Sequence, residues 1–189
     1  MEIRLNTLGI AHDAIARHVS PGDFCIDATA GNGNDTAFLC ELVGETGRVL
    51  ALDIQQQAVE RTRALLESKG LAPIATVVRD SHSNLLRYAQ PGTVSCVVFN
   101  FGYLPGGDHS LYTRPQTSIP AVRQGLTLLK PGGLMCLCIY YGGDTGYEER
   151  DALLSYLKEI DSKVFTVVLS QFYNRPNDPP MAAYVIKGV

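Results

Sequence analysis

Hydrophobic and polar residues follow one another along this chain with two different periods, and their order predicts an α/β fold. Short apolar runs typical of buried strands cover residues 24–26, 48–53, 75–80, 93–101, 134–141, 165–173 and 181–187. Between them, apolar residues recur at helical spacing over residues 7–19, 37–43, 55–69, 115–129 and 147–160. Strands that alternate with helices form a parallel sheet covered on both faces. We therefore predict a doubly wound, seven-stranded sheet.

Two connections refine this picture. The segment Lys130-Pro-Gly-Gly133 predicts a sharp turn ahead of the fifth strand. Residues 174–180 join the last two strands and are short enough for a hairpin, so we expect a mostly parallel sheet with an antiparallel last strand. The 189 residues contain no repeat, low-complexity segment or linker, and we expect a single domain over residues 1–189.

The segment that connects the first strand to the next helix has the composition of a ligand-binding loop. It reads Asp27-Ala-Thr-Ala-Gly-Asn-Gly-Asn-Asp-Thr36, and Gly31 and Gly33 lack the Cβ atoms that would keep a ligand from the backbone. A dinucleotide-binding loop would have a third glycine where Thr36 stands. A carboxylate of Asp27 at the mouth of the loop would repel a phosphate and attract an amino group. The loop therefore favours an amino-acid-like ligand, and a plain tight turn is the alternative.

The second and third strands also end in an acid. Asp53 follows the loop by about 20 residues, the spacing at which a strand-end carboxylate accepts both hydroxyls of a ribose. Asp80 can accept the exocyclic amine of an adenine ring, with Ser81 or His82 lying against the ring. All three acids would face one crevice at the point where the strand order reverses. Exposed strand-end acids without a role are the alternative.

The fourth strand leads into a loop that carries candidate substrate contacts. Residues Asn100-Phe-Gly-Tyr-Leu-Pro-Gly-Gly-Asp108 combine turn formers with two large apolar side chains, which is typical of a functional loop. The side-chain carbonyl of Asn100 can hold an amine donor, and Tyr103 can lie beside a planar ring. His12, in the leading helix, either faces solvent, caps a neighbour or lines the mouth of the crevice.

The composition and charge of the chain bear on its metal binding, its nucleic-acid binding and its cellular compartment. The five cysteines at positions 25, 40, 96, 136 and 138 have no paired spacing, so we expect buried thiols, and Cys136-x-Cys138 is a poor start for a zinc site, so no metal is expected. The net charge of −3 argues against broad nucleic-acid binding but leaves room for a local basic patch. No apolar run approaches the roughly 20 residues of a membrane span. Residues 1–11 are too polar for a signal peptide, and we expect a cytoplasmic protein.

The alternation of strands and helices, with acids at the ends of the first three strands, resembles the class I methyltransferases that use S-adenosylmethionine. The resemblance covers essentially the whole chain. Three segments, 27–36, 100–108 and 174–180, are more closely similar to the MnmM (YtqB) family, long described as rRNA methylases. The resemblance implies that the first loop holds the methionine part of the cofactor, that Asp53 and its neighbours hold the ribose, and that Asp80 and its neighbours hold the adenine. The implied cofactor contacts are Asp27, Thr29, Gly31, Asn32, Gly33, Asn34, Asp35, Thr36, Asp53, Ile54, Gln55, Asp80, Ser81, His82 and Asn100.

The resemblance also implies a substrate, which is the 5-aminomethyl group of 5-aminomethyl-2-thiouridine at the tRNA wobble position. From the chemistry of amine methylation, we expect Asn100, Tyr103 and Asp108 to be the catalytic residues. Asn100 would orient the amine through its carbonyl, Tyr103 would pack on or beside the base, and His12, His109 and Asp108 are candidates for relaying the proton lost afterwards. The family pattern has a Gly-His pair after the fifth strand, where this chain has Gly142-Gly143. A substrate contact by that histidine is therefore either absent here or supplied by another group, such as Asp144 or Tyr141.

Several alternatives remain at this point. A methyltransferase of rRNA or of a small molecule has the same fold, whereas a nicotinamide-dependent oxidoreductase is disfavoured by the missing third glycine and by Asp27. A non-catalytic RNA-binding module would not bind the cofactor. The chain is too small to carry an added RNA-binding domain. We therefore expect its own surface, on one subunit or across a homodimer, to contact the tRNA anticodon stem-loop. The candidate residues are Arg114, Arg123, Lys130 and Arg175, with stacking by Tyr103, Tyr112 or Tyr173.

Overall fold

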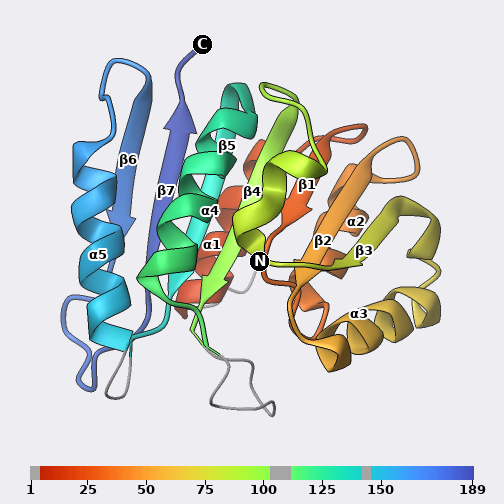
Figure 1. Cartoon of the computed structure of the whole chain (residues 1–189), viewed down its shortest axis with the longest axis horizontal. Coiled ribbons are helices and arrows are strands. Elements are labelled where there is room, and N and C mark those ends of the chain that lie inside the picture. The colour runs from red at the N-terminus through yellow and green to blue at the C-terminus, as the bar shows by residue number, and fades with distance from the viewer. Residues whose placement is uncertain (1–4, 103–111, 142–145) are drawn as a thin grey trace.

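A seven-stranded sheet forms the middle layer of the molecule (Figure 1). The computed structural model describes residues 5–102, 112–141 and 146–189. The strand order is β3-β2-β1-β4-β5-β7-β6, and β7 runs antiparallel to both of its neighbours while the other pairs are parallel. The predicted sheet and its antiparallel last strand are confirmed. The strands are β1 (Phe24–Asp27), β2 (Arg48–Asp53), β3 (Ala75–Arg79), β4 (Val94–Phe101), β5 (Leu129–Ile139), β6 (Phe165–Ser170) and β7 (Met181–Lys187).

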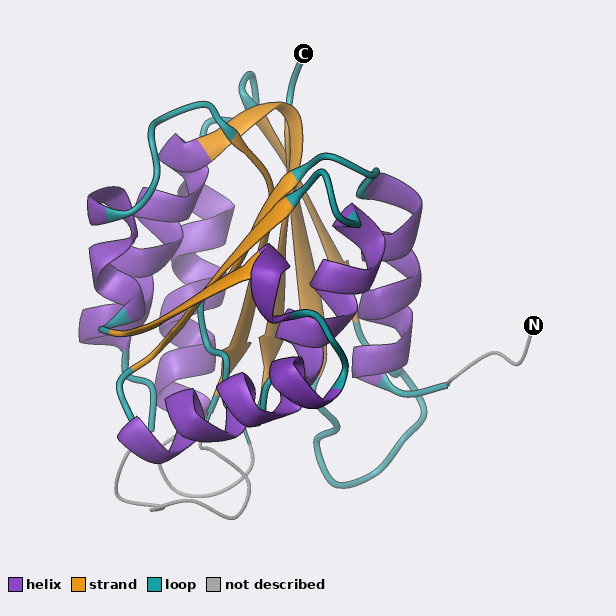
Figure 2. Cartoon of the chain, turned by 90° about the vertical axis from the view of Figure 1, so that its right-hand side faces the viewer, coloured by secondary structure: helices purple, strands orange, loops and turns teal. Residues whose placement is uncertain are grey.

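Helices cover both faces of the sheet, as the view along its edge shows (Figure 2). Side chains of α1, α2 and α3 pack on one face around Ile15, Leu39 and Leu66. Side chains of η2, α4 and α5 pack on the other face around Leu85, Val122 and Leu153. The helices are α1 (Thr7–His18), α2 (Asn34–Val43), α3 (Gln56–Ser68), α4 (Pro115–Leu128) and α5 (Gly146–Glu159), with the short 3₁₀ helices η1 (Ala72–Ile74) and η2 (His82–Arg87), which the periodicity did not predict.

The sharp turn predicted over residues 130–133 is wrong, because these residues belong to β5. Leu129 pairs with Val94, and the next pair along the ladder is Leu134 with Cys96, so β5 carries extra residues between the two pairs. Gly132 has a φ of +74°, a value that a side chain would disfavour. The Pro-Gly-Gly sequence therefore forms a bulge inside β5, and not a turn that precedes the strand.

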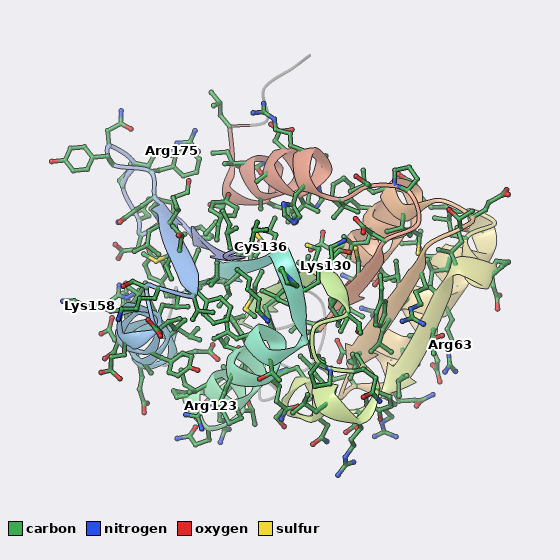
Figure 3. All side chains as sticks on the ribbon, turned by 90° about the horizontal axis from the view of Figure 1, so that it is seen from above. Arg63, Arg123, Lys130, Cys136, Lys158 and Arg175 are labelled. Atoms are coloured by element: carbon green, nitrogen blue, oxygen red, sulfur yellow. The ribbon has the colours of Figure 1, made fainter. Side chains whose placement is uncertain are left out.

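All five cysteines are free and buried, as expected. Cys136 on β5 points into the layer between the sheet and α1 (Figure 3). Burial raises the pKa of Cys25 to about 12 and that of Cys40 to about 11, so both are protonated thiols at neutral pH. In the three described ranges, no helix combines the length and apolar character that crossing a membrane would need.

Candidate active site

A cavity of about 720 Å³ lies at the carboxyl ends of the central strands. The strand order reverses between β1 and β4, and ligands of open α/β sheets bind at such a reversal. The cavity is lined by residues from the ends of β2 and β4, from the loops after β1, β3 and β5, and from α4. The predicted contacts that line it are Thr29, Gly31, Asn32, Asn34, Asp35, Asp53, Ile54, Gln55, Ser81, His82 and Asn100.

Four predicted contacts do not line the cavity, namely Asp27, Gly33, Thr36 and Asp80. Tyr103, Asp108, His109, Asp144 and the Gly142-Gly143 pair lie outside the described residues.

Asp27 does not stand at the mouth of its loop, as the sequence suggested, because its side chain is fully buried. Its Oδ2 accepts a hydrogen bond from Thr36 Oγ1 at 2.6 Å, and its Oδ1 accepts one from the Thr29 backbone N–H at 3.2 Å. Burial, followed by the nearby charge of Asp35, raises the pKa of Asp27 to about 7. Asp27 therefore stabilises the loop from its buried side through these two hydrogen bonds.

The two glycines of the loop have different tasks. Gly31 lines the cavity with a φ of +55°, and its N–H points to the carboxylate of Asp53. Gly33, with a φ of +82°, precedes α2, and a Cβ at this position would lie 2.8 Å from the Cα of Thr62 on α3. Gly31 thus provides a backbone conformation that favours glycine at the cavity wall, whereas Gly33 allows the loop to pack against α3.

Asp53 joins two loops at the cavity wall. Its Oδ2 accepts the N–H of Gly31 at 2.9 Å, and its Oδ1 accepts the N–H of Gln55 at 2.9 Å. A carboxylate has about four lone-pair sites, so each oxygen can accept a further donor from the cavity. The strand-end acid is therefore held in a fixed orientation while it remains available to the hydroxyls of a ribose.

The carboxylate of Asp80 does not line the cavity, and it accepts three hydrogen bonds from within the protein. Its oxygens accept hydrogen bonds from Tyr88 Oη, Asn84 Nδ2 and the Ser81 N–H, each at 2.7 Å. The hydrogen bond from Tyr88, ahead of that from Asn84, lowers the pKa of Asp80. Asp80 thus shapes η2, which brings its neighbours Ser81 and His82 to the cavity.

His82 forms part of the cavity wall as a neutral ring. Burial lowers its pKa to about 4, so the imidazole is uncharged at neutral pH. The ring packs edge-on against Phe99 and Phe101, with ring centroids 6.4 and 6.1 Å away. Its buried Nε2 has no hydrogen-bond partner within the described part of the chain. A polar atom on an apolar wall of this kind suits a heteroaromatic ring.

A chain of three side chains runs from α1 to the end of β4. The backbone N–H of Asn100 donates to Thr29 Oγ1 at 2.7 Å, and Asn100 Nδ2 donates to Asp35 Oδ2 at 2.6 Å. Asp35 Oδ1 lies 2.7 Å from His12 Nε2. The remaining oxygen, Asn100 Oδ1, is buried without a partner among the described residues. His12 thus caps a neighbour and does not line the cavity itself.

Some residues that line the cavity carried no clear signal in the sequence. Tyr140 follows β5, where the strand-end argument used for the acids applies equally, and its neighbour Tyr141, a candidate for the role of the missing histidine, also lines the cavity. Asp178 and Pro180 come from the far end of the chain, and Thr7 Oγ1 of α1 donates to the Pro180 carbonyl at 2.6 Å. No local pattern predicts this approach. The remaining lining residues outside the predicted set are Leu8, Ala28, Ala30, Phe101, Gly102, Thr113 and Thr117.

The four basic residues that we expected near the mouth of the crevice do not lie together. Arg114 lines the cavity, with its guanidinium 4.7 Å from the ring centre of Tyr112. Lys130 lies at the opposite end of the strands, where it forms an ion pair with Asp23 at 2.7 Å (Figure 3). Arg123 stacks on Tyr156 and Arg175 on Phe172, and neither lines the cavity. The expectation was therefore wrong for Lys130.

These features fit S-adenosylmethionine. A volume of about 720 Å³ lies within the range of roughly 300–1,000 Å³ that is usual for small-molecule and cofactor sites. The same cavity is lined by a carboxylate that suits ribose hydroxyls, a neutral aromatic residue that suits a purine, and a glycine loop that suits an amino acid. Within the described ranges, no group of three His, Cys, Asp or Glu side chains converges as a metal site would.

Comparisons with known proteins agree with this geometry. Residues 49–186 match the family described as "Putative rRNA methylase". The chain is 33% identical over 181 residues to "tRNA (mnm(5)s(2)U34)-methyltransferase, chloroplastic" of Arabidopsis thaliana. The match covers 90% of this chain, but the chain spans only 65% of the length of that relative.

Two solved structures share the whole architecture. One, described as a "putative rRNA-methylase" from Clostridium thermocellum, is 46% identical with a TM-score of 0.95 and covers 99% of this chain and 100% of its own. The other, a methyltransferase structure from Streptococcus mutans in complex with SAH, is 35% identical with a TM-score of 0.87 and covers 96% and 98% of the two chains. This chain therefore belongs to the family described as "Putative rRNA methylase", whose members are class I methyltransferases with S-adenosylmethionine as cofactor.

Proposed function

We propose that this chain methylates the amine of 5-aminomethyl-2-thiouridine at the wobble position in the anticodon stem-loop of tRNA. The observation that carries the proposal is the free carbonyl oxygen of Asn100, which is buried at the cavity without a partner among the described residues. A buried acceptor of this kind is costly to leave unpaired, and an amine N–H is a donor that would satisfy it.

The chemistry that the residues must perform is positioning. S-adenosylmethionine, when bound, supplies a methyl group on a positively charged sulfur. Asn100 Oδ1 accepts one N–H of the amine, which orients the nitrogen lone pair and leaves it free to react. Phe101, Tyr140 and Tyr141 line the same cavity and exclude water from it. No strong base is needed, because a neutral amine is already nucleophilic. We propose that Tyr103 packs beside the base and that Asp108 takes up the proton released afterwards.

The choice of RNA as substrate is supported by the name of the Arabidopsis relative and by the rim of the cavity. Arg114 lies over the ring of Tyr112, and both line the cavity. An arginine on an aromatic ring offers a stacking surface for an unpaired base and a charge for its phosphate. We further propose that a homodimer enlarges this surface and that the protein acts in the cytoplasm.

Turnover on RNA tests the proposal directly. Undermodified tRNA that carries 5-aminomethyl-2-thiouridine is incubated with labelled S-adenosylmethionine, and the nucleosides are analysed by mass spectrometry. We expect the 5-methylaminomethyl product with the wild type. Asn100→Ala should lose turnover by about 100-fold or more while it still binds the cofactor. Gln90→Ala, which removes an exposed amide away from the cavity, serves as the control. Wild-type protein that binds cofactor and leaves this tRNA unmodified would refute the proposal.

An rRNA methyltransferase is the second candidate, because the family description and the Clostridium thermocellum structure both use that term. Deletion of the gene separates the two. The proposed function predicts that 5-aminomethyl-2-thiouridine accumulates in bulk tRNA, whereas the alternative predicts normal tRNA and a missing methyl group in rRNA. A small-molecule methyltransferase would leave both RNAs unchanged.

A further inference from the structure

The orientation of the Asn100 amide is determined by side chains from two other elements. Its Nδ2 donates to Asp35 Oδ2 at 2.6 Å, and Asp35 belongs to the first turn of α2. If the amide were rotated by half a turn, its carbonyl oxygen would lie at that short distance from the carboxylate, and two acceptors would face each other. The carboxylate therefore selects the orientation in which Oδ1 is left over.

Asp35 is itself held in place by α1. Its Oδ1 lies 2.7 Å from His12 Nε2, and the His12 ring stacks on Phe38 with centroids 4.0 Å apart and an angle of 13°. The Asp35 side chain is only 8% exposed, so its position tolerates little movement. The position of the carboxylate near the N-terminus of α2 is favourable for a negative charge. One residue from each of α1, α2 and β4 thus forms a single chain of hydrogen bonds.

We propose that Asp35 and His12 are positioning residues that present the Asn100 carbonyl oxygen to the amine of the substrate. The inference rests on the proposed function for the identity of that amine. The arrangement also has a chemical consequence. A carboxylate in the place of the Asn100 carbonyl would stabilise the ammonium form of the substrate, which has no lone pair. The negative charge of Asp35 is instead satisfied by two protein groups, and the substrate meets a neutral acceptor.

Steady-state kinetics on tRNA that carries 5-aminomethyl-2-thiouridine tests the assignment. Asp35→Ala should lower kcat by about 10- to 100-fold, because the Asn100 amide becomes free to turn. Asp35→Asn keeps an oxygen for Asn100 and an N–H for His12, so it should recover most of that loss. His12→Ala should cause a smaller decrease in kcat. The dissociation constant of S-adenosylmethionine should stay within about threefold of the wild-type value in all three variants. Asp13→Ala, which removes an exposed carboxylate next to His12, is the control.

A second measurement needs no RNA. In ¹⁵N-correlated NMR spectra, the side-chain NH₂ of Asn100, assigned by its absence in Asn100→Ala, should show one proton shifted downfield by the carboxylate. Asp35→Ala should remove that shift, and Asp35→Asn should reduce it. If the wild type does not methylate the tRNA, the proposed function fails, and this spectrum still decides the orientation. An unchanged NH₂ signal in Asp35→Ala, an unchanged kcat, or a loss confined to cofactor affinity would each overturn the positioning role.

Discussion

Replacement of Asp53 by alanine should remove most of the affinity for S-adenosylmethionine. The carboxylate accepts two backbone N–H groups at 2.9 Å, from Gly31 and Gln55, and fixes both loops that border the ribose position. Hydrogen bonds to a charged group contribute about 1.5–3 kcal/mol each. Two ribose hydroxyls bound to this carboxylate would thus contribute roughly 3–6 kcal/mol. At about 1.4 kcal/mol per factor of ten, the lower bound corresponds to a loss of about 100-fold in affinity.

Isothermal titration calorimetry with S-adenosylmethionine measures this loss. Asp53→Asn should fall between the wild type and Asp53→Ala, because an amide has one acceptor oxygen for two backbone donors. Asp151→Ala removes an exposed carboxylate on α5 and should bind the cofactor as the wild type does. Thermal unfolding of each variant shows whether the fold is intact. A folded Asp53→Ala variant with an affinity within about threefold of the wild type would contradict the assignment of Asp53 to the ribose.

Three further predictions concern stability. Gly33→Ala should lower the free energy of unfolding by about 2–4 kcal/mol in urea titrations, because of its positive φ and its contact with α3, whereas Gly70→Ala, with a φ of +69° and open space, should lose only about 1 kcal/mol. Burial raises the pKa of Asp27 to about 7, so the stabilisation from its protonated form is fully present below about pH 4 and is lost as the pH rises through 7. The free energy of unfolding should therefore fall between pH 5 and pH 8, and Asp27→Asn should show a smaller fall than the wild type. Glu149→Ala should lower the free energy of unfolding by about 1–3 kcal/mol, since it leaves the buried Ser118 hydroxyl without its acceptor and removes a partner of Thr113, and Glu149→Gln should recover much of that loss.

The cofactor half of the site could be predicted from the sequence because its signals are local. In a parallel sheet, every strand that ends in a polar residue delivers it to the same edge, so Asp53 and Asn100 were placed at one crevice by strand pattern alone. Gly31 could be assigned to the site because its loop follows a predicted strand and precedes a predicted helix. The structure places all three residues at one cavity.

The same argument does not predict the hydrogen-bond partners of Asp27 and Asp80. A strand-end position determines the edge of the sheet at which a side chain lies, but it does not determine which donors surround it. Asp27 turns beneath its loop toward Thr36, and Asp80 turns toward Tyr88 and Asn84. These partners lie four to nine residues further along the chain, and whether they or a ligand satisfy the carboxylate depends on side-chain packing. Sequence pattern does not contain that packing.

The distribution of charge around the cavity is consistent with a cationic cofactor and a polyanionic substrate. Asp53 lies on its wall, where its carboxylate would attract the positively charged groups of S-adenosylmethionine and repel phosphates. Arg114 lines the same cavity on the side of α4, where a phosphate would be attracted. An RNA held in this field would keep its backbone near Arg114 and extend only a base toward Asn100. A nucleotide in a single-stranded loop meets this requirement with the least unstacking, which favours a wobble uridine over a base-paired position.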